Sequence, residues 1–282
     1  MVFIFPFLKL NDELVYEMSK MTDLIVLNEV FKNRYDPFLL KTKYILSNCS
    51  HKNFNKYKNI NKLTIKSNKL FIEYYNSQIT NLKLDFKQWR LNNLNNLNSS
   101  LIYLNISSCY VRNIPSNLIN LTHLNCEYNW ITEIPNTLIN LTYLKCNNCQ
   151  IIEIPKELIN LIVLDISNNK IIKIPNTIIN LKELYCSNNK ITEISKELIN
   201  LTHLNCSYNK ITEIPNTLIN LTYLHCSYNE IREIPNILIN LKELYCSYNE
   251  ITEIPDTLIK LKYLSYSGNK IIEIPKELIN LK

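Results

Sequence analysis

The residues of this 282-residue chain whose side chains could take part in catalysis, metal binding or ligand contact include nine cysteines, four histidines and 18 tyrosines. Most of them recur at steps of 20 residues. No cysteine or serine stands with a base and an orienting group in the pattern of a nucleophilic site. A single glycine, Gly268, excludes the glycine-rich loops of Walker A, Rossmann and kinase phosphate sites. We therefore expect no enzyme, no catalytic residue and no cofactor.

Two sets of side chains raise the question of a metal or a disulfide. Glu183 and His203 are 20 residues apart, and His225 would lie diagonally beyond them if such steps stack. Diagonal neighbours in a sheet are ~7–8 Å apart, which is long for two side chains that bind the same zinc ion, so we expect no metal site. Six cysteines share one repeat position and should point inward as free thiols in a reducing compartment: Cys126, Cys146, Cys186, Cys206, Cys226 and Cys246.

The elements that would position these residues follow from an internal repeat. From Leu101 the pattern LxxLxCSxNxIxEIPxxLIN recurs nine times at a period of 20 residues, and a tenth copy begins at Leu281. Counting Leu101 as position 1, we expect the apolar positions 1, 4, 6, 11, 14, 18 and 19 to be buried. Positions 3 to 6 predict a short strand, with 3 and 5 facing outward, and equal phase in every repeat predicts a parallel sheet.

Two further positions indicate how the repeats are held together. Position 9 is Asn in seven repeats and Cys in two, Cys109 and Cys149. A buried Asn must be hydrogen-bonded, so a column of Asn is expected to bind the backbone where each strand ends. Position 15 is Pro in eight repeats and Ser195 in the ninth, which predicts extended chain or a short 3₁₀ segment on the far side.

The pattern LxxLxCxxNxIxxIP, with Asn or Cys at position 9, resembles the leucine-rich repeat over roughly residues 60–282. This resemblance implies an α/β fold: a right-handed, curved solenoid with a parallel β-sheet on its concave face and an extended or 3₁₀ convex side. It also implies a non-catalytic scaffold that binds a protein partner. The wealth of Asn, Ile and Lys is similar to the repeat proteins of AT-rich giant amoebal viruses (mimivirus type) or protists.

The first hundred residues are less regular. Residues 1–58 predict a small helical N-terminal cap, and residues 59–100 predict irregular leucine-rich repeats at 60–68 and 79–86, before the regular array of 101–282. Within the cap, DLIVLNEVFKNRY at 23–35 and LNDELVYEM at 10–18 resemble the two halves of an F-box, with too short a spacing between them. This resemblance implies the alternative function, a substrate receptor of a ubiquitin ligase.

Charge and hydropathy limit the class of partner and the compartment. Residues 1–100 carry 15 basic and 8 acidic residues, and eight of the lysines lie between Asp36 and Glu73 without an acid. Lysine without arginine recognises phosphate poorly, so we do not expect a nucleic-acid partner.

The start, MVFIFPFL, lacks the features of a leader, and no apolar run would span a membrane. We expect a cytoplasmic protein, in the host cytoplasm if viral, without a membrane or small-molecule partner.

The outward columns of the sheet are the candidate binding surface. Positions 3, 5 and 8 hold ten of the 18 tyrosines and three of the four histidines. Tyrosine suits a wetted protein interface, although codon bias and stacking along the ladder also explain its presence. The predicted partner-binding residues are Tyr143, Tyr185, His203, Tyr208, Tyr223, His225, Tyr228, Tyr245 and Tyr248. The array halts at Lys282, which favours an end-to-end homodimer through the last repeat.

Overall fold

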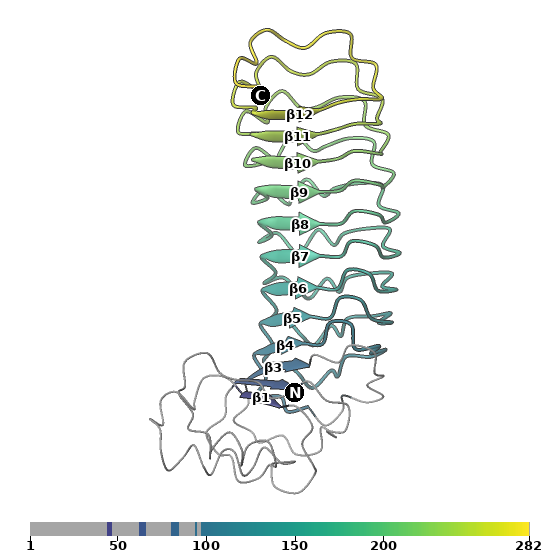
Figure 1. Ribbon diagram of the computed structural model, residues 1–282, viewed down its shortest axis with the longest axis vertical. Coiled ribbons are helices and arrows are strands. Elements are labelled where there is room, and N and C mark those ends of the chain that lie inside the picture. Colours follow the sequence, from purple (N-terminus) through teal and green to yellow (C-terminus); the bar gives the residue numbers. More distant parts are fainter. Residues whose placement is uncertain (1–43, 47–61, 66–79, 85–93, 95–96, 282) are drawn as a thin grey trace, which may run out of the picture.

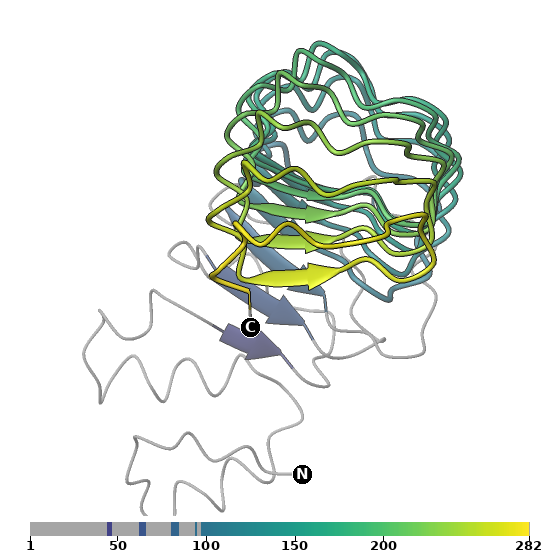
Figure 2. The ribbon, with the colours of Figure 1, turned by 90° about the horizontal axis from the view of Figure 1, so that it is seen from above.

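A computed structural model describes residues 44–46, 62–65, 80–84, 94 and 97–281 of the chain. These residues form a coil whose successive turns stack along one axis, with all strands on one side (Figure 1 and Figure 2). The predicted cap helices and both F-box-like segments, 10–18 and 23–35, lie outside the described residues.

The described strands form one parallel sheet in which each strand pairs only with its sequence neighbours. The first three are β1 (Tyr44–Leu46), β2 (Lys62–Ile65) and β3 (Asn81–Leu84). The nine strands of the regular array are β4 (Tyr103–Asn105), β5 (His123–Asn125), β6 (Tyr143–Lys145), β7 (Val163–Asp165), β8 (Glu183–Tyr185), β9 (His203–Asn205), β10 (Tyr223–His225), β11 (Glu243–Tyr245) and β12 (Tyr263–Ser265).

The strand positions follow from the repeat. From β4 to β11 each strand residue pairs with the residue 20 positions later, as Leu204 does with Leu224. Each strand spans positions 3 to 5, with the leucine at position 4 directed into the coil and positions 3 and 5 outward. Strands β2 and β3 fall on the irregular repeats predicted at 60–68 and 79–86. The sheet begins with β1, inside the segment predicted as a helical cap.

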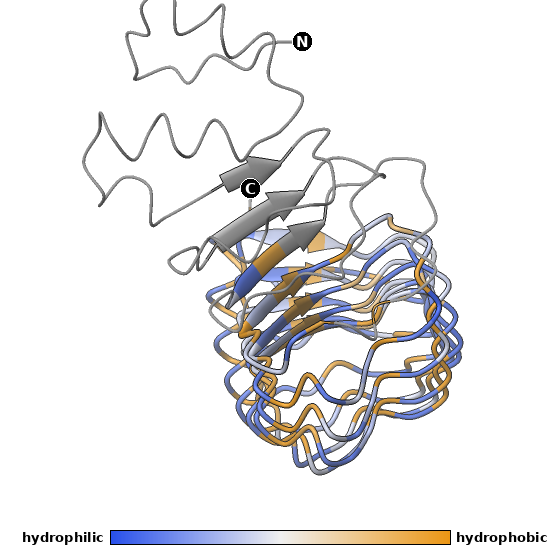
Figure 3. Cartoon of the chain, turned by 90° about the horizontal axis from the view of Figure 1, so that it is seen from below, coloured by the Kyte–Doolittle hydropathy of each residue, from blue (hydrophilic) through white to orange (hydrophobic). Residues whose placement is uncertain are grey.

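The core is a continuous apolar column inside the coil. One of the repeat positions that the sequence predicted to be buried in it is exposed instead. Positions 1, 4, 6, 11, 14 and 18 are buried through nearly all of the array, and apolar and polar stretches alternate around each turn (Figure 3). Position 19 is not buried: its isoleucines from Ile119 to Ile259 are 46–53% exposed. The reason is local, because position 19 lies in a turn directly after the buried residue at 18, so that its side chain points outward.

The asparagine at position 9 joins each turn of the coil to the one before it, as predicted. Asn209 donates from Nδ2 to the carbonyls of Cys186 and Cys206 at 2.9 and 3.0 Å, and its Oδ1 accepts from the backbone N–H of Ile191 at 2.9 Å. The same bonds recur at Asn169, Asn189, Asn229 and Asn249. Where cysteine takes this place the contact is weaker: the Cys149 thiol lies 3.4 Å from the carbonyl oxygen of Cys126.

The asparagines at position 20 form a second hydrogen-bonded column, which was not predicted from the sequence. Its Nδ2 donates to the carbonyl at position 19 of the preceding repeat, as in Asn200 to Ile179 at 3.0 Å and Asn220 to Ile199 at 2.9 Å. The Thr217 hydroxyl makes a similar bond to the Lys196 carbonyl at 2.6 Å. Within the sheet, backbone carbonyls accept from the backbone N–H groups of neighbouring strands. These carbonyls lie away from the sheet, so side chains supply the donors for them.

The far side of the coil consists of extended chain and turns. The Pro215 carbonyl accepts from the N–H of Leu218 at 3.2 Å, and this single-turn bond recurs along the array. The described residues therefore have the predicted parallel-sheet solenoid with an extended far side, but no helix occurs among them, so the α part of the predicted α/β class is not seen there. Twenty residues per turn leave too short a return segment for a helix.

We predict that Asn209→Ala destabilises the protein by about 1–3 kcal/mol, because the buried N–H of Ile191 loses its acceptor. The carbonyls of Cys186 and Cys206 each lose one of two asparagine donors and keep the other, from Asn189 and Asn229. Urea unfolding followed by circular dichroism measures the change. Asn209→Cys should lose less, since cysteine fills this position at Cys149.

The matched control is Asn216→Ala, seven residues later on an exposed part of the same repeat. It should leave the unfolding midpoint unchanged. Equal losses at Asn209 and Asn216 would contradict the structural role of position 9.

Candidate functional site

The outward side chains of the sheet divide along the coil into a polar part and an aromatic part. Strands β6 and β7 present Lys145 and Asp165, beside Glu127 and Asn147 at position 7. Burial raises the pKa of the Asp165 carboxyl, while the Ser167 backbone and Lys145 oppose that shift.

Strands β8 to β11 present three aromatic residues in addition to a tyrosine–glutamate pair at each end. We call the outward residues of β8 to β11 the aromatic floor: Glu183, Tyr185, His203, Asn205, Tyr223, His225, Glu243 and Tyr245.

The rings of the aromatic floor contact one another across neighbouring strands. The His203 and Tyr223 rings stack with centroids 5.9 Å apart. Tyr223 and Tyr245 lie 5.7 Å apart at an interplanar angle of 46°, and His225 and Tyr245 lie 5.4 Å apart at 56°. Burial lowers the pKa of His225, so this ring is neutral at pH 7. The tilted rings leave part of each face open to a ligand.

Each end of the aromatic floor carries a carboxylate held by a tyrosine of the same strand. The Tyr185 hydroxyl donates to Oε2 of Glu183 at 3.0 Å, and the Tyr245 hydroxyl donates to Oε2 of Glu243 at 3.1 Å. Burial, and then the bond to Glu183, raise the pKa of Tyr185 to about 12, so this phenol remains a donor at any physiological pH. Within the described residues neither Glu183 nor Glu243 forms an ion pair.

Beside the aromatic floor, position 8 forms a column of three stacked tyrosines, Tyr208, Tyr228 and Tyr248, which we call the tyrosine column. Neighbouring centroids are 4.2 and 4.4 Å apart, with interplanar angles of 10° and 16°. The three side chains are 40–52% exposed. Their faces cover each other, so the column presents ring edges and hydroxyls to solvent.

The backbone under the tyrosine column is left-handed. Tyr208, Tyr228 and Tyr248 have φ of 54°, 58° and 58°. Other repeats place Asn at this position, at Asn148, Asn168 and Asn188, and asparagine adopts this conformation more readily than a bulky residue. The tyrosines are therefore held in a backbone conformation that does not favour them.

The only glycine of the chain, Gly268, continues the same position with φ of 71°. A Cβ at Gly268 would lie 2.7 Å from Cδ1 of Tyr248. Glycine is thus required by the ring of Tyr248 as well as by the turn, and it closes one end of the tyrosine column.

The structure brings eight of the nine predicted residues together and leaves one apart. Tyr185, His203, Tyr223, His225 and Tyr245 lie on the aromatic floor, and Tyr208, Tyr228 and Tyr248 form the column next to it. Tyr143 lies on β6, where it stacks with His123 at 5.6 Å and lies 5.8 Å from the Lys145 ammonium. Strand β7, with Val163 and Asp165, separates Tyr143 from the rest.

The residues considered for metal binding have other partners. Glu183 accepts from Tyr185 and His203 stacks on Tyr223. No group of three His, Cys, Asp or Glu side chains in the described part of the chain is arranged to hold a metal ion. The position-6 cysteines are buried free thiols, and burial raises the pKa of Cys206 and Cys246 to about 12.

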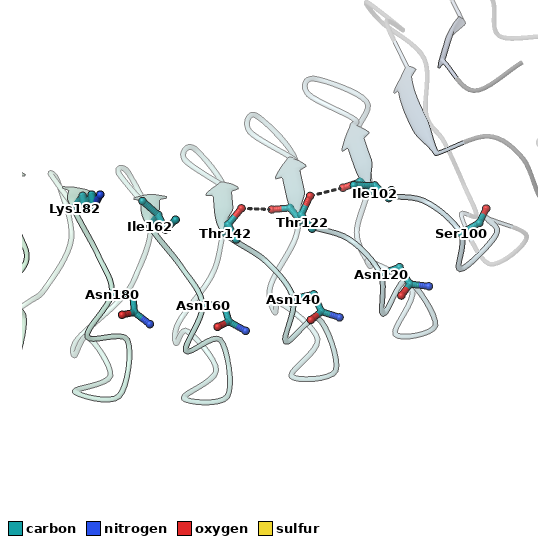
Figure 4. A pocket seen from close by; sticks show the side chains of 10 residues that line it. All are labelled: Ser100, Ile102, Asn120, Thr122, Asn140, Thr142, Asn160, Ile162, Asn180 and Lys182. Carbon is teal, nitrogen blue, oxygen red and sulfur yellow. Dashed lines mark hydrogen bonds between the residues drawn. The ribbon is translucent and has the colours of Figure 1, made fainter. Parts of the chain in front are cut away.

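A shallow groove runs along the edge where the chain enters the strands (Figure 4). Positions 20 and 2 line it, including Asn120, Thr122, Asn140 and Thr142. The Thr122 and Thr142 hydroxyls bond the carbonyls of Ile102 and Thr122, and the Asn amides bond the preceding repeats. Since these donors already serve the coil, the groove offers less chemistry than the aromatic floor.

Comparison with known families identifies the repeats. The model of two-copy leucine-rich repeats matches residues 159–199, 179–218, 199–238 and 219–260, and the single leucine-rich-repeat model matches residues 120–141. A search of curated proteins by sequence found no match.

Solved structures with the same fold include a leucine-rich-repeat protein of Leptospira interrogans (TM-score 0.66, 26% identity, 79% of this chain and 64% of that one). The functional domain of InlJ from Listeria monocytogenes, described as including a cysteine ladder, has a TM-score of 0.59 at 28% identity over 73% of this chain and 52% of that one. The ectodomain of the Arabidopsis receptor kinase HAESA, in complex with an IDA peptide hormone, has a TM-score of 0.60 at 28% identity over 79% and 40%. The chain thus spans less than two thirds of each of these proteins.

The coil therefore has the leucine-rich-repeat fold, and the resemblance seen in the sequence is confirmed for the repeats at residues 120–141 and 159–260. The matched families are those of interaction scaffolds, and none is a family of enzymes. Within the described residues no helix is long and apolar enough to cross a bilayer.

We predict that Gly268→Asn displaces the ring of Tyr248 and destabilises the protein by about 1–2 kcal/mol, although asparagine tolerates the backbone. A double-mutant cycle with Tyr248→Asn isolates this contact. In the Tyr248→Asn background the Gly268→Asn change should cost close to nothing. Equal costs in both backgrounds would show that the strain lies in the turn and not in the ring contact.

Proposed function

We propose that this chain is a non-catalytic scaffold that binds a protein partner on the strand face of its solenoid, the face that the repeat family makes concave. The contact surface consists of the aromatic floor and the tyrosine column, with Tyr143 at its margin. The HAESA ectodomain, which has the same fold, is described in complex with a peptide hormone, and this supports a peptide or protein ligand here.

The observation that carries the proposal is the left-handed backbone of the tyrosine column. A bulky residue with φ near 55° is disfavoured by about 1 kcal/mol relative to asparagine or glycine. Asn and Tyr codons are equally rich in A and T, so an AT-rich genome does not favour tyrosine over the asparagine that serves the same turn at Asn148, Asn168 and Asn188. Stacking of the rings offsets part of the strain. Three exposed and strained tyrosines in a row are best explained by a bound partner.

Two finer assignments belong to the same proposal. We propose a cytoplasmic, reducing location, in a host cell if the chain is viral, because all eight cysteines among the described residues are free thiols. An F-box-like role in ubiquitination is a second candidate that rests on residues 10–18 and 23–35, and it requires that the full chain bind the ligase adaptor. End-to-end dimerisation stays a prediction.

We predict that changing Tyr208, Tyr228 and Tyr248 together to Asn abolishes partner capture while the fold is kept. Asparagine relieves the backbone strain and removes the stacking, so the unfolding free energy should change by less than about 2 kcal/mol. Affinity purification from the native cells, with quantitative mass spectrometry, compares the proteins retained by each form.

The matched control changes Ile152 and Ile172 to Thr, since these exposed side chains lie at position 12, away from the strand face. The control should retain every protein that the unchanged chain retains. Undiminished capture by the tyrosine variant would refute the strand face as the binding surface.

We predict that the position-6 thiols resist alkylation in the native protein and that Cys149, which is partly exposed, reacts first among the cysteines that the structure describes. Because the folded pKa of Cys206 and Cys246 lies near 12 and their ordinary value is 9.0, the folded state binds more protons above pH 9. Stability is therefore full below pH 9 and falls as the pH rises from 9 toward 12.

Alkylation with mapping of each cysteine by mass spectrometry, and urea midpoints between pH 8 and 11, test this expectation. The thiols should react uniformly in urea. Disulfides between neighbouring position-6 cysteines in protein purified without reductant would contradict the proposed reducing location.

A further inference from the structure

The aromatic floor combines open aromatic faces with carboxylates that lack a cationic partner. Its outward residues on β8 to β11 include Glu183 and Glu243 and no Lys or Arg. Lys182 and Lys242, which directly precede the two glutamates, are exposed at position 2, on the edge of the sheet. Neither carboxylate forms an ion pair within the described part of the chain. This surface is therefore negative and has no internal counter-charge.

The two tyrosine–glutamate pairs orient the carboxylates before any ligand arrives. In each pair the phenol donates to Oε2 of the glutamate two residues earlier, at 3.0 Å in β8 and 3.1 Å in β11. An acceptor that is already held loses less side-chain freedom when a ligand binds. The remaining lone pairs of each carboxylate suit a guanidinium or an ammonium.

Between the carboxylates lie rings that attract cations. The Tyr223 ring stacks on His203 but is tilted by 46° from Tyr245, so the Tyr223 and Tyr245 rings do not cover each other as those of the tyrosine column do. A guanidinium or ammonium within about 6 Å of such a face is attracted by the ring quadrupole. Arginine fits better than lysine, because its planar group stacks on a ring and forks onto a carboxylate.

The spacing of the carboxylates sets the spacing of the ligand. Glu183 and Glu243 occupy position 3 of strands that are three steps apart in the sheet. Three parallel strand spacings amount to about 14 Å. An extended peptide lying across the strands covers that distance in about four residues, and its residues i and i+4 face the same side.

We propose that the aromatic floor binds an extended basic segment of a partner protein, with one arginine at Glu183, a second four residues along at Glu243, and the side chain between them on Tyr223. This inference rests on the proposed function and specifies the ligand of the same surface. Binding is electrostatic in part and weakens with salt.

The test uses the full chain and a labelled peptide of about eleven residues, made of serine and threonine with two arginines four residues apart. Fluorescence anisotropy measures its dissociation constant. We expect binding in the micromolar range. Replacement of both arginines by citrulline, which is neutral and similar in shape, should weaken binding at least tenfold. A peptide with the arginines three residues apart should also bind more weakly, because its two side chains face opposite sides.

Variants of the chain locate the site. Glu183→Gln and Glu243→Gln should each weaken binding about tenfold. Tyr223 pairs directly with Glu243, so the arginine at Glu243 also lies beside its ring, and Tyr223→Leu should weaken binding while Tyr223→Phe retains most of it. The matched control is Glu213→Gln with Glu233→Gln, the same change of charge at exposed position 13 on another side of the coil. It should leave the affinity unchanged.

Three outcomes would overturn the inference: equal binding of the citrulline peptide, equal losses in the position-13 control, or no binding at all. The first would indicate an uncharged ligand and the second a non-specific attraction. Loss of native partner capture in the tyrosine-column variant, together with no binding of the arginine peptide, would leave the proposed function standing and this inference refuted.

Discussion

The structure depends on one interaction, the bond from the position-9 asparagine to the backbone of the preceding repeat. A turn of 20 residues buries about six apolar side chains, which does not offset the conformational entropy of ordering it alone. Stability must come from contacts between turns. Asn209 meets this requirement where the strand ends, because it satisfies carbonyls of two repeats and an N–H of one. The asparagines at position 20 do the same on the other side of the coil, as Asn200 shows.

This dependence on side-chain amides gives the composition a structural meaning. The chain has 44 asparagines, and two columns of the repeat use them as donors to backbone carbonyls. Codon bias supplies asparagine, but the bonds make it necessary at positions 9 and 20. The single glycine has a similar explanation, because Gly268 is the one position-8 residue against which a tyrosine ring lies too close for a Cβ. Proline at position 15 starts the single-turn bond on the far side.

The sequence predicted the repeat, the strands and the position-9 bonds because each depends on one residue type at a fixed place. It failed where the deciding factor was the local direction of the chain. Ile119 looks like a core residue by type, yet the turn that follows Leu118 directs it outward. Of the candidate binding residues, Tyr143 shares a column with Tyr223 but is separated from it by Val163, Glu183 and His203. The left-handed φ of Tyr208 has no sequence signal other than asparagine at the same position in other repeats.

The same regularity that stabilises the coil determines how it recognises a ligand. A strict 20-residue period places equivalent atoms at intervals of one strand spacing. Charged side chains at the same repeat position on the strand face are therefore separated by multiples of about 4.8 Å. Glu183 and Glu243 are three such spacings apart, and the rings of His203 and Tyr223 lie between them. Replacing outward residues at positions 3 and 5 changes the ligand without touching the bonds that hold the turns together, since those bonds come from positions 9 and 20. Stability and specificity are thus encoded in separate columns of one repeat, which lets the strand face diverge while the core stays nearly uniform.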